Sequence, residues 1–315
     1  MDVTPEDVIA AHKRIQDGVH CTPVLCSQRL NAQFGVELYF KCENLQKVGA
    51  FKARGALNAV RQLTPAQRHH GVITHSSGNH AQALARAARL SGLNATVVMP
   101  SNAPANKKAA VLGYGARVIE CEPTLVAREH TTQALMREGQ QTLIHPYDDP
   151  LVIAGQGTAA WEFIEQCPNL EALIVPVGGG GLMAGTALAV LAARANIAVI
   201  GAEPVGAADA HAGFTLGVRQ TGLTATTIAD GLRGELSPRT FALMQAHVAD
   251  IYTVSEAAIW QAMGLILNTL KLVVEPSAAV ALASLVGRTL PYRRVGIILS
   301  GGNVDPTLWS GLSVS

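Results

Sequence analysis

Short apolar runs alternate with longer runs rich in alanine and leucine along most of the chain. The short runs are almost continuously apolar, which is typical of strands that are covered by helices on both faces. Seven of them are expected to be strands: Leu38–Cys42, Val72–His75, Ala95–Met99, Arg117–Cys121, Leu173–Val177, Ala198–Ala202 and Val295–Leu299.

Helices are expected between these strands, for example over Ala81–Leu90, Leu182–Ala193 and Ser277–Val286. Three further helices have clear start signals, in which a serine or threonine cap precedes a proline or an acidic residue. These signals are Thr4-Pro5, Thr64-Pro65 and Ser255-Glu256. The alternation of strands and helices predicts an α/β protein with mostly parallel sheets.

Composition limits the kinds of partner. The chain has 315 residues, of which 49% are hydrophobic and 15% charged, and this excludes a disordered protein. Its 24 basic and 23 acidic residues leave a net charge of +1, and no basic run stands out. We therefore expect neither nucleic acid nor a membrane as a partner, but a small neutral or zwitterionic molecule. The length suggests two domains or one large one.

One uncharged segment, Ala172–Ala193, is long enough to span a bilayer. It contains Pro176 and the run Gly178–Gly181, so a strand, a glycine turn and a buried helix explain it better. The acidic N-terminus does not resemble a signal peptide. Five cysteines without a CxxC pair are expected to be buried or half-buried thiols in a reducing cytoplasm: Cys21, Cys26, Cys42, Cys121 and Cys167.

Three apolar strands each lead into a turn of small residues. These turns are Ser76–His80, Gly178–Gly181 and Ser300–Asn303. Ligands of open α/β sheets bind beyond the carboxyl ends of the strands, so the three turns suggest one composite site.

The glycine run indicates a phosphate site, because glycine allows close backbone approach and the following helix offers free N–H groups. A P-loop is excluded, since Gly185 is followed by Thr186 rather than by lysine. A dinucleotide site stays open: residues 179–184 fit a relaxed GxGxxA pattern, and Glu203 ends the next strand where a ribose-binding acid belongs.

Lys52 lies among small and apolar neighbours in the segment Val48–Ala56. Such surroundings desolvate an amine and lower its pKa, as Schiff-base chemistry requires. A lone lysine is usually a solvated surface residue, so this feature needs support from the rest of the chain.

That support comes from a resemblance. The segment Phe51–Ala56 and the three turns occur in the same order in one family of pyridoxal-phosphate enzymes. The chain resembles the tryptophan-synthase-β type (fold type II), and within it the serine/threonine dehydratases and serine racemases, over essentially its whole length. The resemblance implies two open, twisted, mostly parallel sheets flanked by helices. It also implies a large cofactor-binding domain (residues 1–68 and 149–315) and a small mobile domain (69–148) that closes over the substrate.

The resemblance implies pyridoxal 5'-phosphate as the cofactor, joined covalently to Lys52, which then removes the substrate α-proton. The other implied cofactor contacts are the phosphate cradle Gly178, Gly179, Gly180, Gly181 and Met183, the ring-oxygen partner Asn79, the ring neighbour Phe51 and the pyridine-nitrogen partner Ser300. A serine at the pyridine nitrogen leaves it largely neutral, which favours elimination over transamination.

The implied substrate contacts are Ser76, Ser77, Gly78, Asn79 and His80, whose N–H groups at a helix start suit a carboxylate. Ser77 matches a serine that, in racemases, exchanges a proton on the face opposite the lysine. Other dehydratases also carry serine there, so both activities stay open. Arg128 matches an arginine near the substrate carboxylate in racemases, although an isolated arginine is as often a surface cation.

Glu203, Ala207 and Asp209 match the metal positions of serine racemases. Two carboxylates and a backbone carbonyl suit Mg²⁺ or another divalent cation. The alternative is that these acids belong to the first turns of a helix, where the helix dipole favours them.

The main expectation is a cytoplasmic ammonia-lyase that eliminates water from a β-hydroxy amino acid, most simply L-serine or L-threonine, to give a 2-oxo acid and ammonia. The alternatives are a serine racemase with side dehydratase activity and a 3-hydroxyaspartate dehydratase. From another class, an NAD-dependent oxidoreductase is retained. The resemblance also implies a homo-oligomer, either a dimer or a tetramer.

Overall fold

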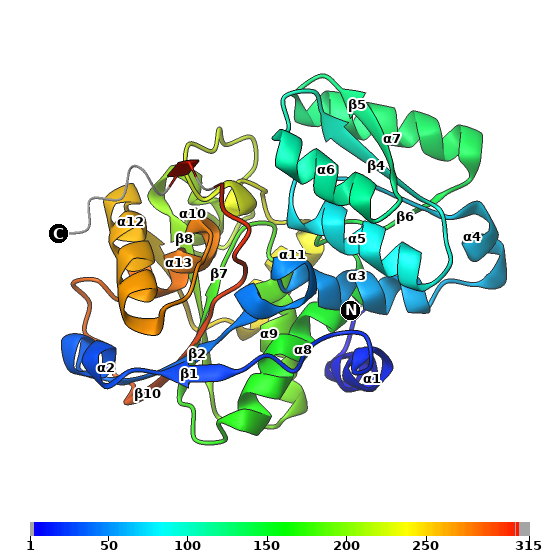
Figure 1. The fold of residues 1–315 in the computed structure, drawn as a ribbon. Helices are drawn as coiled ribbons and strands as arrows, with labels where there is room; N and C mark the ends of the chain where they lie inside the picture. The colour runs from blue at the N-terminus through cyan, green and yellow to red at the C-terminus, as the bar shows by residue number, and fades with distance from the viewer. Residues whose placement is uncertain (1–2, 306, 309–315) are drawn as a thin grey trace.

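The computed structural model describes residues 3–305 and 307–308 of the chain. Its strands form two separate sheets with helices packed around them (Figure 1). All strands of the smaller sheet lie between residues 72 and 143, so this sheet is an insertion into the chain that forms the larger one. The predicted α/β class with two mostly parallel sheets is confirmed.

The larger sheet has six strands, in the order β1 (Val24–Cys26), β2 (Glu37–Lys41), β10 (Arg294–Ile298), β7 (Ala172–Pro176), β8 (Ala198–Pro204) and β9 (Asp250–Val254). β1 is antiparallel to β2, and all other neighbours are parallel. Ile297 of β10 pairs with Phe40 on one side and with Ile174 on the other. One apolar cluster includes Val175 of β7, and a second includes its neighbour Ile174. Adjacent strand residues point to opposite faces, so both faces of this sheet are covered.

The smaller sheet has four parallel strands, in the order β5 (Arg117–Cys121), β4 (Ala95–Pro100), β3 (Val72–His75) and β6 (Thr142–Leu143). Helices α5 (Asn79–Leu90), α6 (Ala105–Gly113) and α7 (Leu125–Gly139) lie beside it (Figure 1). Its core also includes Leu57 of α3 (Lys52–Arg61). Because α3 also contacts α8 (Pro150–Gln166), it lies where the helices of the two sheets meet.

The remaining α-helices are α1 (Pro5–Ile15), α2 (Gln28–Phe34), α4 (Pro65–His70), α9 (Gly181–Ala192), α10 (Asp209–Leu216), α11 (Pro238–His247), α12 (Glu256–Leu265) and α13 (Pro276–Ala283). The three predicted start signals are confirmed. Thr4 and Thr64 form capping boxes at α1 and α4, and the Ser255 hydroxyl accepts the N–H of Ala258 at α12.

All seven predicted strands are present, with ends shifted by no more than two residues. Three further strands, β1, β6 and β9, were not predicted. β1 and β6 have only three and two residues, and β9 lies at the edge of the sheet and begins with Asp250. Short or edge strands lack the continuous apolar run that marks a doubly covered strand.

The uncharged segment 172–193 forms β7, a glycine turn and α9, as predicted. Within residues 3–305 and 307–308, no helix is both long and apolar enough to cross a membrane. All five cysteines are free thiols. Cys21 and Cys26 are exposed, which corrects the expectation that all five are buried or half-buried. Cys26 is the last residue of the short outer strand β1, and Cys21 precedes that strand.

Candidate active site

Lys52 is the first residue of α3, and its amine is desolvated. The Nζ atom donates a hydrogen bond to the carbonyl of Pro146 at 2.6 Å and lies 5.0 Å from the centre of the Phe51 ring. Burial lowers the pKa of Lys52 to about 8, although the Glu275 carboxylate acts in the opposite direction. An amine with this pKa has a substantial neutral fraction near neutral pH, and that fraction can act as a nucleophile or base.

The start of α3 is attached to the turn that follows β10. The Phe51 N–H donates to the carbonyl of Ser300 at 3.0 Å, and Ala50 forms an antiparallel bridge with Gly301. Ser300 is buried, with 3% of its surface exposed. The structure therefore brings Phe51, Lys52 and Ser300 together, as the sequence predicted, although their roles toward a cofactor stay predictions.

Asn79 connects the first turn to the third. Its Oδ1 accepts a hydrogen bond from Asn303 Nδ2 at 2.8 Å, and its Nδ2 donates to both carboxylate oxygens of Glu275. Burial raises the pKa of Glu275 to about 7, against the hydrogen bonds from Asn79. Glu275 was not predicted from the sequence. The available signal was its position, directly after the apolar run Leu272–Val274 and directly before Pro276.

The glycine run forms the bend that leads into α9. Gly180 has φ of +83°, a conformation that favours glycine. A Cβ at Gly179 would lie 2.4 Å from the Tyr147 ring, and one at Gly178 would lie 2.9 Å from the Cα of Leu232. The bend therefore has no room for larger side chains, and its N–H groups lie at the start of a 12-residue helix. This arrangement suits a phosphate.

Tyr147 belongs to residues 144–149, which lead from β6 to α8. Its phenol pKa is raised to about 12 by burial. The preceding residue, Pro146, supplies the carbonyl that accepts the hydrogen bond from Lys52. The following residue, Asp148, accepts a hydrogen bond from Ser237 Oγ at 3.0 Å and also binds Arg239. This segment therefore connects the lysine to the glycine bend, a connection that the sequence analysis missed.

The Ser76–His80 turn lies between β3 and α5, and Ser76, Ser77, Gly78 and Asn79 are half-buried. His80 is buried, and its Nε2 bonds to the carbonyl of Ile144 at 3.0 Å. Burial lowers the pKa of His80 to about 3, so this imidazole stays neutral. With its side chain engaged in this way, His80 would contribute to a carboxylate site chiefly through its backbone N–H. Met183 would likewise contribute to the phosphate cradle chiefly through its backbone, because its side chain packs in the core near Gly201.

Arg128 is on α7 and half-exposed. The pKa of His75, the last residue of β3, is lowered by burial and further by the charge of Arg128. His75 also packs edge-on against His145, with ring centres 5.7 Å apart. Arg128 therefore acts on the end of the strand that leads into the Ser76–His80 turn.

Glu203 is the second-last residue of β8, Ala207 and Asp209 follow this strand, and all three are buried. The Glu203 carboxylate accepts the N–H groups of Ala210 and His211, and Asp209 accepts the N–H of Leu236. Burial raises the pKa of Glu203 to about 8, with a further contribution from the charge of Asp209, and burial raises the pKa of Asp209 to about 6. Two neighbouring buried carboxylates of this kind fit a cation. Both Glu203 oxygens are engaged by α10, which gives no support to a ribose-binding role.

The residues present fit pyridoxal phosphate. A desolvated amine, a glycine bend at a helix start and a buried serine suit its aldehyde, phosphate and pyridine nitrogen, respectively. Lys52, the Gly178–Gly181 bend and Ser300 would hold these groups, and Asn79 lies in the same hydrogen-bonded assembly.

Comparisons with known proteins agree with this fit. The family model described as "Pyridoxal-phosphate dependent enzyme" matches residues 15–301. The chain is 46% identical over 304 residues to the beta-hydroxyaspartate dehydratase of Paracoccus denitrificans, covering 96% of each chain. It is 45% identical over 309 residues to the serine racemase of Dictyostelium discoideum, covering 96% of this chain and 95% of that one. Among solved structures, the threonine deaminase of T.th. superposes with a TM-score of 0.90 at 43% identity, over 95% of this chain and 98% of that one.

Proposed function

Because the chain belongs to the family of pyridoxal-phosphate-dependent enzymes, we propose that it is an ammonia-lyase that eliminates water from a β-hydroxy amino acid. The products are a 2-oxo acid and ammonia, and L-serine and L-threonine are the simplest substrates. The observation that carries the proposal is the desolvated Lys52 amine, which lies where the turns after β3, β7 and β10 are connected.

Pyridoxal phosphate, when bound, supplies an electron sink for the negative charge that develops at the substrate α-carbon. The chain's own residues do the rest. Lys52 Nζ takes the α-proton, and its pKa of about 8 suits a base near neutral pH. The N–H groups of the Ser76–His80 turn hold the substrate carboxylate at the start of α5.

Loss of the α-proton and of the β-hydroxyl makes an enamine from the substrate. The enamine tautomerises, and hydrolysis then consumes one water and releases ammonia and the 2-oxo acid. Ser300 would favour this course, because a hydroxyl that holds the pyridine nitrogen would provide no negative charge to keep that nitrogen protonated.

Closure of residues 69–148 over the substrate excludes water during the reaction. Two features support this division. The smaller sheet is separate from the larger one and is formed by strands between residues 72 and 143, and the ion pair of Lys107 on α6 with Asp230 joins this part of the chain to the rest at 2.7 Å. Exposed ion pairs of this kind are weak, so the contact can open and close at small cost.

Replacement of Lys52 by Ala tests the proposal. Turnover of L-serine and L-threonine should be abolished, and borohydride should no longer fix pyridoxal phosphate to the protein, while the circular dichroism spectrum stays unchanged. Lys13→Ala, on the exposed side of α1, is the control and should retain both properties. A Lys52→Ala protein with native turnover would show that the assignment is wrong.

A second candidate, dehydration of 3-hydroxyaspartate, is favoured by one observation. The charge of Arg128 acts on His75 at the end of β3, which leads into the substrate turn, and this charge would attract a second substrate carboxylate there. Two matched relatives have this substrate class in their names. Comparing kcat/KM for 3-hydroxyaspartate, serine and threonine decides between the candidates, and Arg128→Met should selectively reduce the acidic substrate's value.

Serine racemisation is the third candidate, and Ser77 and the matched racemase favour it. Chiral analysis of the serine left after partial reaction detects it, and Ser77→Ala should remove racemisation but leave elimination.

We further propose that Glu203, Asp209 and the Ala207 carbonyl bind Mg²⁺ or another divalent cation. Assembly into a dimer or tetramer is proposed from the family and is measured by analytical ultracentrifugation.

A further inference from the structure

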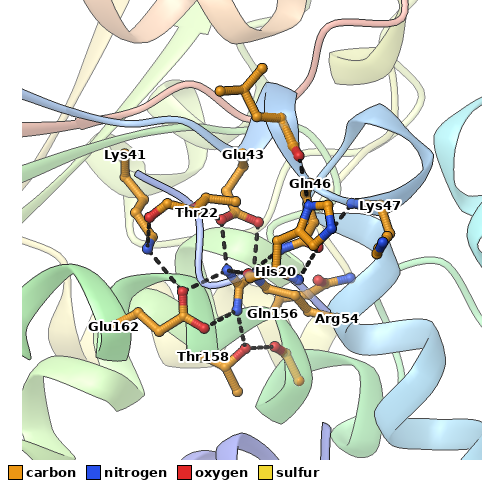
Figure 2. Close-up of polar contacts among 12 residues, drawn as sticks. His20, Thr22, Lys41, Glu43, Gln46, Lys47, Arg54, Gln156, Thr158 and Glu162 are labelled. Atoms are coloured by element: carbon orange, nitrogen blue, oxygen red, sulfur yellow. Dashed lines mark hydrogen bonds and ion pairs between the residues drawn. The ribbon is translucent and has the colours of Figure 1, made fainter. Parts of the chain in front are cut away.

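A cluster of buried charged side chains lies behind Lys52, on the far side of α3. Its members are Lys41, Glu43, Arg54 and Glu162, none more than 4% exposed. The Arg54 guanidinium binds Glu43 and Glu162, each through two hydrogen bonds of 2.7–2.8 Å (Figure 2). Lys41 Nζ donates to Glu162 at 2.8 Å, so two cations and two carboxylates balance. Because residues two apart point to opposite sides of a helix, this cluster fixes the side of α3 that faces away from Lys52.

On the Lys52 side of α3, the contact is made by a glutamine of α8. Gln156 is fully buried, and its Oε1 accepts the N–H of Gly55 at 3.2 Å. Gly55 is three residues after Lys52, so the two lie on the same side of the helix. A Cβ at Gly55 would lie 2.4 Å from Gln156 Nε2 and 2.7 Å from the Val152 carbonyl. The first turn of α3 is therefore in backbone contact with α8.

The Gln156 amide is not satisfied in the way that a purely structural glutamine would be. Its Nε2 is buried without a hydrogen-bond partner among the described residues. A buried N–H group without a partner costs free energy, of order 1–3 kcal/mol. The favourable contact that the structure shows for this amide is the bond from Gly55, one helical turn from the reactive amine.

We propose that Gln156 is a positioning residue for Lys52: it fixes the first turn of α3 against α8 and so sets where the Lys52 amine lies. The inference rests on the proposed function in one respect, that Lys52 is the reacting amine. The Arg54 cluster holds the opposite side of the helix, so loss of the Gln156 bond lets the first turn shift rather than unfold. A misplacement of about 1 Å at a reacting group reduces a rate by about 100-fold.

The test compares three variants. Gln156→Met removes the acceptor for Gly55 but keeps the side-chain length; Gln156→Glu keeps an acceptor at the helix start. Thr186→Val is the matched control, because Thr186 is also buried with an unpartnered hydroxyl among the described residues but lies on α9. The first readout uses protein stripped of pyridoxal phosphate: the pH dependence of Lys52 acetylation, followed by mass spectrometry. The second is kcat and KM of the loaded enzyme.

In Gln156→Met, the pKa of Lys52 should rise from about 8 toward that of an exposed lysine, because water reaches the amine. The kcat should fall between about 10-fold and 100-fold with KM within about twofold. Gln156→Glu should restore both values, and Thr186→Val should change neither. If Gln156→Met fails to fold, Gln156→Asn, which withdraws the acceptor by one methylene, takes its place.

A Lys52 titration in Gln156→Met that matches the wild type overturns the inference. Equal losses in the Glu and Met variants also overturn it, because they indicate a general packing role. Failure of the proposed function has a different signature. In that case, borohydride fixes no pyridoxal phosphate to Lys52 of the wild type, while the titration in the cofactor-free protein still decides whether Gln156 positions the amine.

Discussion

Two groups of buried charged residues differ in whether their carboxylates have cationic partners: the group around Arg54 and the pair Glu203 and Asp209. The difference distinguishes a group that only stabilises the fold from one that suits a ligand. Around Arg54, each carboxylate meets a cation. Burial acts to raise the pKa of Glu162, but hydrogen bonds from Arg54 and the charge of Lys41 outweigh it, and the pKa is lowered. At the end of β8 and the start of α10, Glu203 and Asp209 are held by backbone N–H groups, and burial raises the pKa of both.

The balanced group needs no ligand, whereas burial opposes the ionisation of Glu203 and Asp209, and a divalent cation bound there would favour their charged forms. The balanced group is attached to α3, which carries Lys52, so under the proposed function its rigidity would serve catalysis indirectly. The contrast teaches that burial of an acid does not itself mark a ligand site; the presence or absence of a cationic partner does.

The largest expected effect comes from breaking the balanced group. Arg54→Met leaves the carboxylates of Glu43 and Glu162 buried with a single lysine, and should reduce the free energy of unfolding by about 3–5 kcal/mol. Urea unfolding followed by circular dichroism measures it. If Arg54→Met lowers the free energy of unfolding by less than about 1 kcal/mol, the carboxylates around Arg54 do not depend on their cationic partner, and the distinction from Glu203 and Asp209 fails.

A change of opposite sign is expected at the unbalanced pair. Asp209→Asn keeps the acceptor for the Leu236 N–H but removes a charge, so the metal-free variant should be more stable than the metal-free wild type. Mg²⁺ should stabilise the wild type, by about 2.7 kcal/mol at about a hundred times its Kd, and should not stabilise the variant. Equal stabilisation of both proteins by Mg²⁺ would contradict the proposed site.

The smallest effect is a pH dependence of the balanced group. The folded-state pKa of Glu162 lies below its unfolded value, so its contribution is complete above the unfolded pKa and is lost as the pH falls through the folded one. Glu162→Gln keeps a hydrogen-bond acceptor for Arg54 and should flatten the loss of stability below about pH 4.5. The difference should be about 1.5 kcal/mol, as for a charged hydrogen bond. Thermal unfolding between about pH 3 and pH 7 measures it, and parallel curves for the two proteins would count against it.

Most of the fold could be predicted because strands covered on both faces have continuous apolar runs. The meeting of the turns after β7 and β10 was also predictable, since these strands are parallel neighbours and their carboxyl ends lie on the same edge. The turn after β3 belongs to the other sheet, so its place beside them depends on how the two sheets pack. What failed were the short strands β1 and β6 and the edge strand β9, which lack that signal.

The charged partners could not be predicted, for a different reason. Lys41 and Glu162 are 121 residues apart, and Asn79 and Glu275 are 196 apart. Nothing local at either residue indicates its partner, because the pairing depends on how α3, α8 and the turns pack. Lys52 could be found from its small and apolar neighbours and from the family motif, whereas Gln156 and Glu275 emerge only from the assembled structure.

The central place of β10 has a consequence for how the protein is made. This strand, the last of the ten that the described residues form, pairs with both β2 and β7, so the larger sheet lacks its middle until the ribosome has synthesised residues 294–298. The smaller sheet is complete once residue 143 has left the exit tunnel. During translation, the nascent chain should therefore acquire the smaller sheet first, and the edges of β2 and β7 that will pair with β10 should stay open, where chaperones would recognise them.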